Sequence, residues 1–244
     1  MRIGLQLYTM RFEEEKDFPG LLKKIANIGY DGVEFAGYFG YTPAQIREML
    51  EETGLTAAGS HVSLARFEEN FDLELSYLKE LGMKFVSLPS LPKEAYESKE
   101  GLLAVAKRIR PLVQKLNGEG ISLSFHNHTQ EYETVWDGQK LEDLLTDQVP
   151  GLHLEIDTGW CSAAGEDTPA RIAAAGELLD LIHVKDVRGR TPVTLGTGDV
   201  TVEANIRAAQ IAGIEWFIVE QDPPAENPTT FADLEANLAF IRRC

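Results

Sequence analysis

The sequence contains little cysteine and no long hydrophobic run. Cys161 and Cys244 are the two cysteines among 244 residues. They are too few for a disulfide framework and lack the C-x-x-C spacing of zinc sites. Reduced thiols in a cytoplasmic protein are the simplest expectation. No stretch approaches the roughly 20 apolar residues of a membrane span, and the opening MRIGLQLYTMRFEEE is apolar for too short a distance to resemble a signal peptide. We therefore expect no membrane partner.

Positive charge is also scarce. Lysine and arginine number 23 against 39 aspartates and glutamates, which gives a net charge of −16. An acidic surface repels phosphate backbones, so the composition argues against nucleic acid as a partner.

Two common catalytic motifs are missing. The first β-rich run ends in LQLYTM instead of a glycine-rich phosphate loop, which argues against a doubly wound dinucleotide-binding sheet. Ser162 has no G-x-S-x-G surroundings. The run LGTGDVT at 195–201 contains only G-x-G, and it indicates a turn capped by Asp199 ahead of a helix, or else a loop over a site.

Short apolar runs and longer amphipathic segments alternate along the whole chain. The runs favour strands buried on both faces of a parallel sheet; they cover 2–8, 31–36, 56–62, 84–89, 121–127, 152–157, 179–186 and 216–221. Helices are expected between them, among them 18–29, 42–54, 101–120, 167–176, 199–213 and 227–243. Thr42 and Thr168 stand where caps belong, each followed by proline, and Pro111 should kink or divide its helix. Eight such units predict an α/β fold, a single (β/α)8 TIM-barrel domain over 1–244.

Polar residues gather where the predicted strands end, which is where barrels of this kind build active sites. They are Gln6, Tyr8, Glu34, His61, His126, Asn127, His128, Glu155, Asp157, His183, Lys185, Asp186, Glu220, Gln221 and Asp222. Four of the five histidines are among them, whereas His153 begins its strand and belongs at the opposite mouth. Ionisable groups on apolar strands are costly unless they are paired or bound to a metal.

Each of these residues has a structural alternative when it is considered alone. Asp157 could cap a helix, a strand-end histidine could be a satisfied structural residue, and Glu220 could be a solvated edge. Lys185 could pair with a carboxylate or carry a proton, and Trp160 could pack or stack on a sugar ring. Ionisable residues end three neighbouring strands, and their occurrence together favours a functional site. If Asp157, His183 and Glu220 all point into the mouth, they form a ligand set of two carboxylates and one imidazole that suits Mg or Mn, with Zn also possible.

The strand-end segments EIDTGW, IHVKD and IVEQD, with GSHVSL and FHNHTQEY, resemble the sugar isomerase/epimerase family with the xylose isomerase-like barrel. The resemblance spans essentially the whole chain. It implies divalent-metal ligands at Asp157, His183 and Glu220. Many members also carry a metal-binding glutamate on strand 5, and Ser124 stands there in this chain. The FHNH segment looks closer to a branch with YHNH on that strand, whose following glutamate matches Glu131.

The resemblance implies an isomerase or epimerase that removes a proton next to a carbonyl of a sugar, keto-sugar or inositol derivative. The expected proton carriers are His126, Lys185, His61 and Glu220, and the expected substrate-binding residues are His128, Glu131, Glu34 and Trp160. Mn or Mg is expected ahead of Zn, and a homo-oligomer is consistent with relatives that pair through barrel helices. Dehydration or β-elimination, metal-dependent hydrolysis and a non-catalytic sugar-binding barrel are the alternatives, of which the acidic charge disfavours nucleic-acid hydrolysis.

Overall fold

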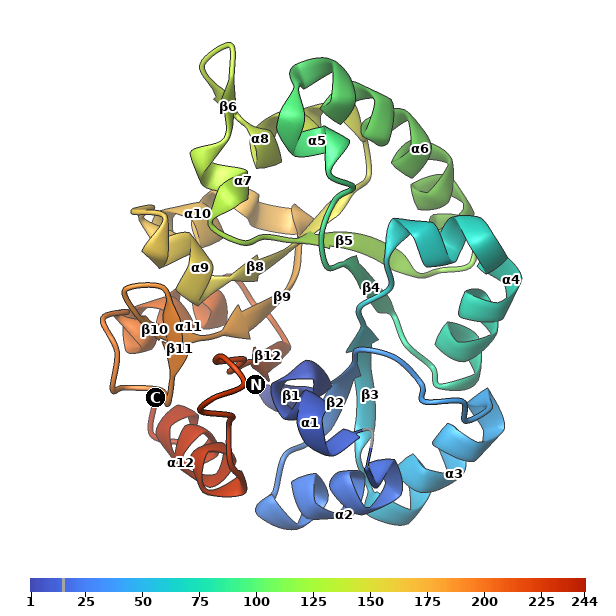
Figure 1. The fold of residues 1–244 in the computed structure, drawn as a ribbon, viewed down its shortest axis with the longest axis vertical. Coiled ribbons are helices and arrows are strands. Elements are labelled where there is room, and N and C mark those ends of the chain that lie inside the picture. The colour runs from blue at the N-terminus through green and yellow to red at the C-terminus, as the bar shows by residue number, and fades with distance from the viewer. Residues whose placement is uncertain (15) are drawn as a thin grey trace.

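A nearly closed ring of parallel strands forms the centre of the molecule in this computed structural model (Figure 1). The structure describes residues 1–14 and 16–244, and within them eight strands pair in the order β3-β2-β1-β12-β9-β8-β5-β4. Their bounds are β1 Arg2–Gln6, β2 Gly32–Phe35, β3 Thr56–Ser60, β4 Phe85–Leu88, β5 Ser122–His126, β8 His153–Asp157, β9 Leu179–Val184 and β12 Trp216–Val219. The predicted α/β barrel is confirmed.

The ring closes weakly between β3 and β4. In the described part of the chain these strands meet through one isolated parallel bridge, between His61 and Ser87. The N–H of Val62 also donates to the Ser87 carbonyl over 3.0 Å. The barrel is therefore nearly closed, and its least regular join lies beside a residue of the predicted site.

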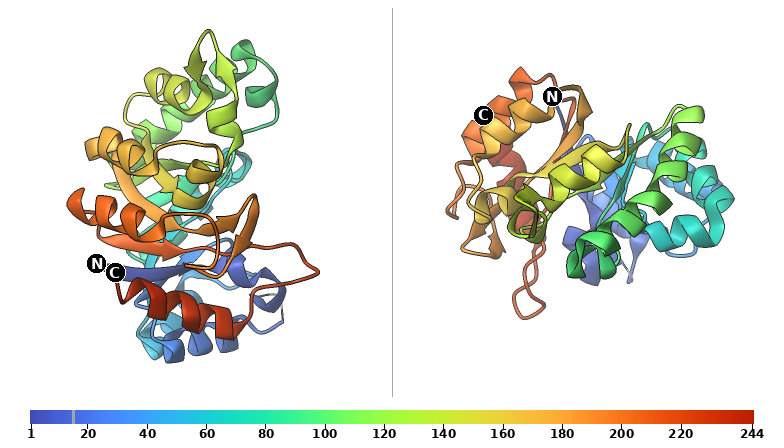
Figure 2. Two further views of the ribbon diagram at one scale, coloured as in Figure 1. Left: turned by 90° about the vertical axis from the view of Figure 1, so that its left-hand side faces the viewer. Right: turned by 90° about the horizontal axis from the view of Figure 1, so that it is seen from above.

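Helices surround the ring on its outer side, as the two views of Figure 2 show. The longer ones are α2 Phe18–Ile28, α3 Pro43–Thr53, α4 Leu64–Glu80, α6 Lys99–Gly118, α8 Leu141–Gln148, α10 Thr168–Ala175, α11 Val202–Ile211 and α12 Phe231–Ile241. Shorter elements lie in the connections: 3-10 turns at Leu7–Met10 and Gly176–Leu178, helices α1 Arg11–Glu14, α5 Glu94–Glu97, α7 Gln130–Glu133 and α9 Thr158–Ala163, and hairpins β6 Val135–Trp136 with β7 Gln139–Lys140 and β10 Asp186–Arg188 with β11 Thr191–Val193. None of the described helices is long and apolar enough to cross a membrane.

Three local predictions need correction. Pro111 lies inside α6, which continues through it, so of the two predicted effects the division of the helix is wrong. The cap of α10 is Asp167, whose side chain accepts the Ala170 N–H, and not Thr168. Asp199 does not cap α11, because its carboxylate accepts the Gly189 N–H instead.

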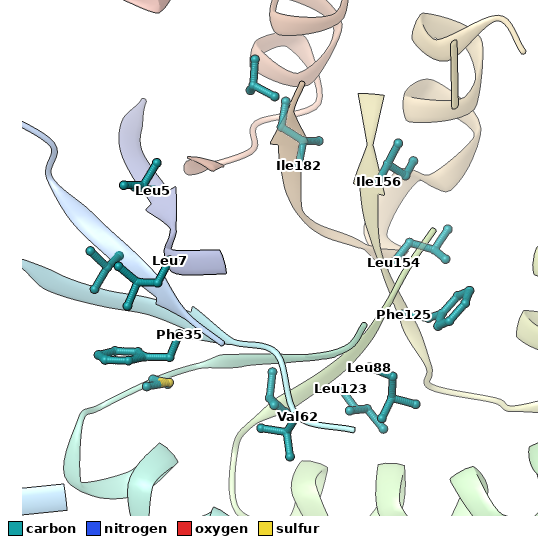
Figure 3. Close-up of a cluster of buried hydrophobic side chains, with 14 of the residues drawn as sticks. Leu5, Leu7, Phe35, Val62, Leu88, Leu123, Phe125, Leu154, Ile156 and Ile182 are labelled. Atoms are coloured by element: carbon teal, nitrogen blue, oxygen red, sulfur yellow. The ribbon is translucent and has the colours of Figure 1, made fainter. Parts of the chain in front are cut away.

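Alternation along each strand separates an apolar outer layer from the barrel interior. Leu5, Phe35, Phe125, Ile156 and Ile182 belong to the core beneath the helices (Figure 3). Inward-pointing residues nearer the N-terminal ends of the strands, which we call the lower end of the barrel, form a second small cluster made of Ala58, Leu181, Trp216 and Ile218. Neighbouring residues on a strand point to opposite faces. The polar residues next to these apolar ones therefore point into the barrel, and those near the carboxyl ends of the strands line its mouth.

Candidate functional site at the C-terminal mouth of the barrel

The structure brings most of the predicted site residues together at this mouth. Glu34, Asp157 and His183 lie at strand ends and are fully buried, His126 and Lys185 are nearly so, and Glu220 is 6% exposed. A buried ionisable group is stable only with a partner. Together with neighbouring side chains, all of them except Glu34 fall into two adjoining groups according to their contacts.

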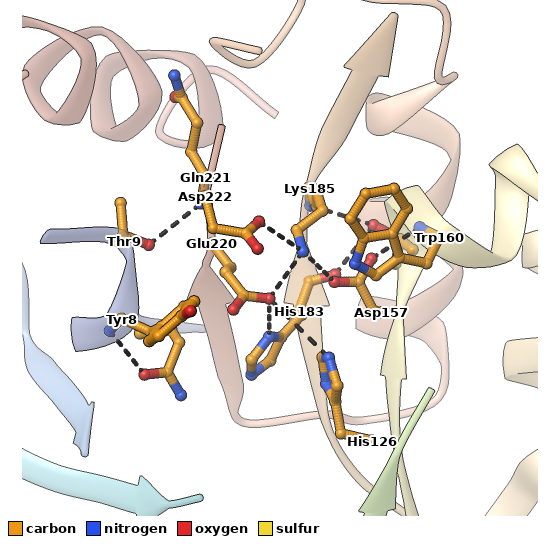
Figure 4. A network of polar contacts seen from close by, with 12 residues as sticks. Tyr8, Thr9, His126, Asp157, Trp160, His183, Lys185, Glu220, Gln221 and Asp222 are labelled. Atoms are coloured by element: carbon orange, nitrogen blue, oxygen red, sulfur yellow. Dashed lines mark hydrogen bonds and ion pairs between the residues drawn. The ribbon is translucent and has the colours of Figure 1, made fainter. Parts of the chain in front are cut away.

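The first, which we call the lysine group, consists of Asp157, Lys185, Glu220 and Asp222. The Lys185 Nζ lies 3.0 Å from Asp157 Oδ2, 2.9 Å from Glu220 Oε2 and 3.1 Å from Asp222 Oδ1 (Figure 4). It also lies 4.5 Å from the centre of the Trp160 ring. Burial alone would lower the pKa of Lys185, but the three carboxylates outweigh it and raise the pKa. Lys185 is therefore held as an ammonium ion.

Asp157 caps a helix and also belongs to the lysine group. Its Oδ1 accepts the Trp160 N–H at the start of α9 over 2.8 Å, while its Oδ2 faces Lys185. Gly159 in the first turn of α9 is required for this packing, because a Cβ there would come within 2.7 Å of the Lys185 side chain. The predicted helix cap is therefore confirmed, and the role of Asp157 as a metal ligand stays a prediction.

The second group, which we call the histidine group, consists of His61, His126, Glu155 and His183. Glu155 Oε2 lies 2.6 Å from His61 Nε2 and 3.1 Å from His126 Nδ1, and its Oε1 lies 3.3 Å from His183 Nε2. Three imidazoles thus converge on one carboxylate. Sequence reasoning placed Glu155 on the same face as Asp157 but did not include it among the site residues, although that shared face was the available signal.

His183 joins the two groups. Its Nδ1 lies 2.9 Å from Glu220 Oε2 and its Nε2 lies 2.7 Å from Glu34 Oε2. Gln6 holds the same Glu34 oxygen over 2.7 Å. Burial would lower the pKa of His183, but Glu155, Glu34 and Glu220 together raise it well above its usual value.

His126 has the opposite electrostatic character. Burial, reinforced by the neighbouring His183 and His61, lowers its pKa well below the usual histidine value, despite its contact with Glu155. His126 is consequently neutral near pH 7. A neutral imidazole has a lone pair that can accept a proton or bind a metal ion.

Ser124, the position at which the resemblance implied a metal-binding glutamate, faces away from the mouth. Its Oγ donates to Asp180 Oδ2 over 2.5 Å, and Ser122 donates to the same oxygen over 2.6 Å. Across the strand pair, His126 is in register with Glu155 of β8. The carboxylate next to His126 therefore comes from the neighbouring strand.

Two predicted substrate-binding residues follow β5. Glu131 is buried, and its oxygens accept the His128 N–H and the Tyr96 hydroxyl, each over 2.6 Å. This network holds the segment after β5 in place, and it does not include a member of the lysine or histidine group. His128 lies beside it, 6.2 Å from Trp160 between ring centres. Roles in substrate binding for His128, Glu131 and Trp160 stay predictions.

A cavity of about 420 Å³ opens above these groups. Its walls combine site residues with residues of the loops after β1, β2, β3 and β4. They are Tyr8, Ala36, His61, Ser63, Arg66, Pro89, Ser90, His126, His128, Glu220 and Asp222. This volume lies within the range of small-molecule pockets.

Two overlapping sets of four side chains have the chemistry to hold a metal ion. One contains the predicted ligands Asp157, His183 and Glu220 together with His126, and the other is the histidine group; in each set the donor atoms lie within 4.8 Å of one another. Among the described residues, the buried oxygens Glu34 Oε1 and Glu155 Oε1 accept no well-aligned hydrogen bond. Nitrogen and carboxylate donors with unused capacity fit a divalent ion.

The barrel and its two groups define the chain as an α/β-barrel protein with a buried histidine and carboxylate centre at the C-terminal mouth. It belongs to the xylose isomerase-like TIM barrel family, whose model matches residues 22–244. The expected family is thereby confirmed, while membership of the YHNH branch stays a prediction.

Similar proteins of known description cover nearly the whole chain. Inosose dehydratase of Geobacillus kaustophilus is 25% identical over 89% of this chain and 88% of that protein. Inosose dehydratase of Salmonella typhimurium is 22% identical over 90% of this chain and 86% of that protein. The crystal structure of a sugar phosphate isomerase/epimerase from Parabacteroides distasonis superposes with a TM-score of 0.86 at 20% identity, covering 100% of this chain and 98% of that one. At that identity the likeness concerns the fold.

Proposed function

We propose that this protein is a divalent-metal-dependent, sugar-modifying enzyme that dehydrates a keto-sugar or keto-inositol. The observation that carries the proposal is the pairing of opposite proton chemistry at one cavity. Lys185 is held as a cation by three carboxylates, and the neutral His126 lies 4.0 Å from Glu220, between Nε2 and Oε2, on the cavity wall. The similarity to two inosose dehydratases supports this substrate class.

The reaction begins at a C–H bond next to the substrate carbonyl. His126 accepts the proton, or Glu220 does so in its place, and the electron pair of that bond forms a carbon–carbon double bond as the β-hydroxyl leaves. The leaving oxygen takes up a proton, so the balanced products are water and an unsaturated ketone or its tautomer. A bound divalent ion supplies Lewis-acid stabilisation of the negative charge that develops on oxygen. Lys185 holds the Glu220 carboxylate in place through their ion pair and adds positive charge beside the cavity.

The arrangement of the proton carriers favours chemistry on one face of the substrate. His61 and His126 lie 4.9 Å apart between ring centres, and His126 lies 4.0 Å from Glu220. A sugar ring does not fit between groups this close, so these groups approach it from one side. A syn elimination and an aldose–ketose isomerisation can both proceed on one face, whereas epimerisation at one carbon needs carriers on two faces. Isomerisation therefore remains the second candidate.

The test is turnover in deuterium oxide by the purified, metal-supplemented protein. Keto-inositols and keto-sugars are followed by NMR, which separates loss of water from deuterium exchange. We expect an unsaturated or dicarbonyl product from at least one keto-inositol. Isomerised product without loss of water would favour the second candidate. If no compound shows either deuterium exchange or product, both candidate reactions are contradicted. The alternative of a non-catalytic sugar-binding barrel is then left.

A further inference from the structure

We propose that Arg66, held in place by Glu74, recognises the substrate at the end away from the reacting atoms, and that this ion pair selects an uncharged, hydroxyl-bearing ring over its phosphate derivative. The inference rests on the proposed function, since it concerns the substrate of the same site. Arg66 takes no part in proton transfer; it is a residue that determines specificity.

Arg66 lies across the mouth from the residues expected to hold the metal ion. It belongs to the first turn of α4, which follows β3, and it lines the cavity. In the order of the eight strands, β3 is four places from β9 in either direction, so these two strands stand opposite each other. His183 lies near the end of β9. A substrate bound at the metal residues therefore presents its other side toward β3 and Arg66.

A break in α4 fixes the Arg66 side chain. Asn70 has backbone angles outside the helical range, φ −154° and ψ 75°, and its side chain accepts the Leu73 N–H over 3.2 Å as the helix resumes. Residues eight positions apart in a straight helix are separated by about 12 Å along the axis. Here Nε and Nη2 of Arg66 donate to the two oxygens of Glu74, each over 2.9 Å. The bend brings the pair together, and this double contact fixes the plane of the guanidinium.

Aromatic rings support the same guanidinium. Its central carbon lies 5.5 Å from the centre of the Tyr38 ring, and Tyr38 stacks on Tyr77 with 3.8 Å between ring centres. The Tyr38 hydroxyl donates to Ser60 Oγ over 3.1 Å, and the Tyr77 hydroxyl donates to the Tyr41 carbonyl over 2.8 Å. Arg66 is therefore held on two sides before a substrate arrives, which reduces the conformational entropy that binding removes.

The fixed guanidinium keeps hydrogen-bond donors for a ligand. An arginine side chain carries five N–H groups, and the bonds to Glu74 use one on Nε and one on Nη2. The Arg66 side chain is 36% exposed, whereas that of Glu74 is 5% exposed. The remaining N–H groups can donate to hydroxyl oxygens of a substrate at the cavity wall, where Ser63 and Ser90 supply further hydroxyls.

The pairing with Glu74 decides which ligand suits this wall. Among the described residues that line the cavity, Arg66 is the only lysine or arginine, and Glu74 balances its charge. Burial raises the pKa of the Glu74 carboxyl, although Arg66 opposes the rise, so Glu74 depends on this cation for its charge. Glu220 and Asp222 face the same cavity. A phosphate group there would meet like charge that repels it, whereas neutral hydroxyls would not.

The experiment compares one ring with and without a phosphate group. Inositol has no carbonyl, so the proposed reaction cannot consume it, and inositol monophosphate adds charge to the same ring. Dissociation constants for both are measured on the whole, metal-supplemented protein by titration calorimetry and ligand-observed NMR. We expect the wild type to bind inositol more tightly than its phosphate. Arg66→Met should weaken inositol binding by roughly 10–100-fold, the usual contribution of a hydrogen bond from a charged group.

Glu74→Gln tests the second half of the proposal. The variant releases the charge of Arg66, so it should improve binding of inositol monophosphate relative to inositol by roughly tenfold or more. The double variant Arg66→Met/Glu74→Gln should lack this gain, because the gain comes from the freed guanidinium and not from looser packing.

Arg108→Met and Glu68→Gln are the matched controls. Nε and Nη2 of Arg108 donate to the two oxygens of Glu68, each over 2.8 Å, and neither residue lines this cavity. Both controls should leave the two dissociation constants unchanged, and circular dichroism checks that every variant is folded. For a substrate that turns over, Arg66→Met should raise KM more than it lowers kcat, because a contact away from the reacting atoms is the same in the ground and transition states.

Three outcomes would overturn the inference. They are a wild type that binds inositol no more tightly than its phosphate or binds neither, a folded Arg66→Met protein that binds inositol as the wild type does, and no gain for the phosphate in Glu74→Gln. None of these measurements requires turnover. A protein that shows the expected binding but converts no keto-inositol or keto-sugar would contradict the proposed function and leave the role of Arg66 in binding intact.

Discussion

Both ends of this barrel carry histidine and carboxylate pairs, buried at the mouth and partly exposed at the lower, N-terminal end, and they differ in how completely those pairs are satisfied. At the lower end, His153 Nδ1 lies 2.8 Å from Asp180 Oδ1, and the other Asp180 oxygen accepts two serine hydroxyls. At the mouth, His183 contacts three carboxylates at once. One oxygen of each of Glu34 and Glu155 there, Oε1, accepts no well-aligned hydrogen bond from the described residues.

The difference separates a structural pair from a functional one. A satisfied pair needs nothing further and stabilises the fold, as the one around Asp180 does. A cluster with converging charges and unused acceptors is costly in a folded protein unless a ligand completes it. Sites of this kind are where binding and catalysis are expected.

The sharpest test of the comparison exchanges one histidine at each end for alanine. We expect His126→Ala to lower turnover of the identified substrate by about 10²–10⁴-fold, because that is the usual contribution of a general base. His153→Ala should leave turnover unchanged, since the lower end is outside the cavity. Steady-state kinetics on folded variants decide it. A fully active His126→Ala protein would remove His126 from the mechanism.

Removing the cation of the lysine group should have the next largest effect. Lys185→Met leaves three carboxylates facing one another without their counter-ion, and breaking a buried pair costs about 3–5 kcal/mol of unfolding free energy. Lys79→Met is the control, because its pair with Glu119 is exposed and should be worth about 0–1 kcal/mol. Urea denaturation measures both. Equal stability of the two variants would show that Lys185 does not hold the carboxylates together.

A smaller effect is expected for Ser124→Ala. The variant removes one hydrogen bond to Asp180 and leaves the one from Ser122, so it should cost about 1 kcal/mol of unfolding free energy. Turnover and divalent-ion binding should not change. Loss of either in the folded variant would return the strand-5 position to the chemistry of the mouth.

The lower pair should also make stability weakly dependent on pH. The hydrogen bond from His153 to Asp180 raises the pKa of His153 in the folded protein, although partial burial lowers it. Its stabilisation is therefore fully present below the unfolded histidine pKa of about 6.5 and is lost as the pH rises through the folded pKa. Unfolding free energies across this range should decline less in His153→Gln than in the wild type. If the unfolding free energies of the two proteins decline equally with pH, the His153–Asp180 pair does not cause the decline.

Much of the site could be predicted because strand periodicity fixes direction. A histidine at the end of an apolar strand must point into the mouth when its neighbours pack against helices, and this applies to His126 and His183. The same rule placed His153 at the opposite end, which the structure confirms. Local pattern was less informative about caps, where Asp167 replaced the expected Thr168, and about the segment before α11.

The sequence by itself determined the barrel, the face on which each strand-end residue lies, and the family, because these follow from periodicity and from motifs in order along the chain. Only the tertiary structure decided which carboxylate meets which cation. Glu155 and Asp157 are equivalent in local pattern, yet one faces three imidazoles and the other faces Lys185. The reason is that these contacts depend on register and tilt between neighbouring strands, including a register shift between β8 and β9, and no residue's own surroundings in the chain specify them.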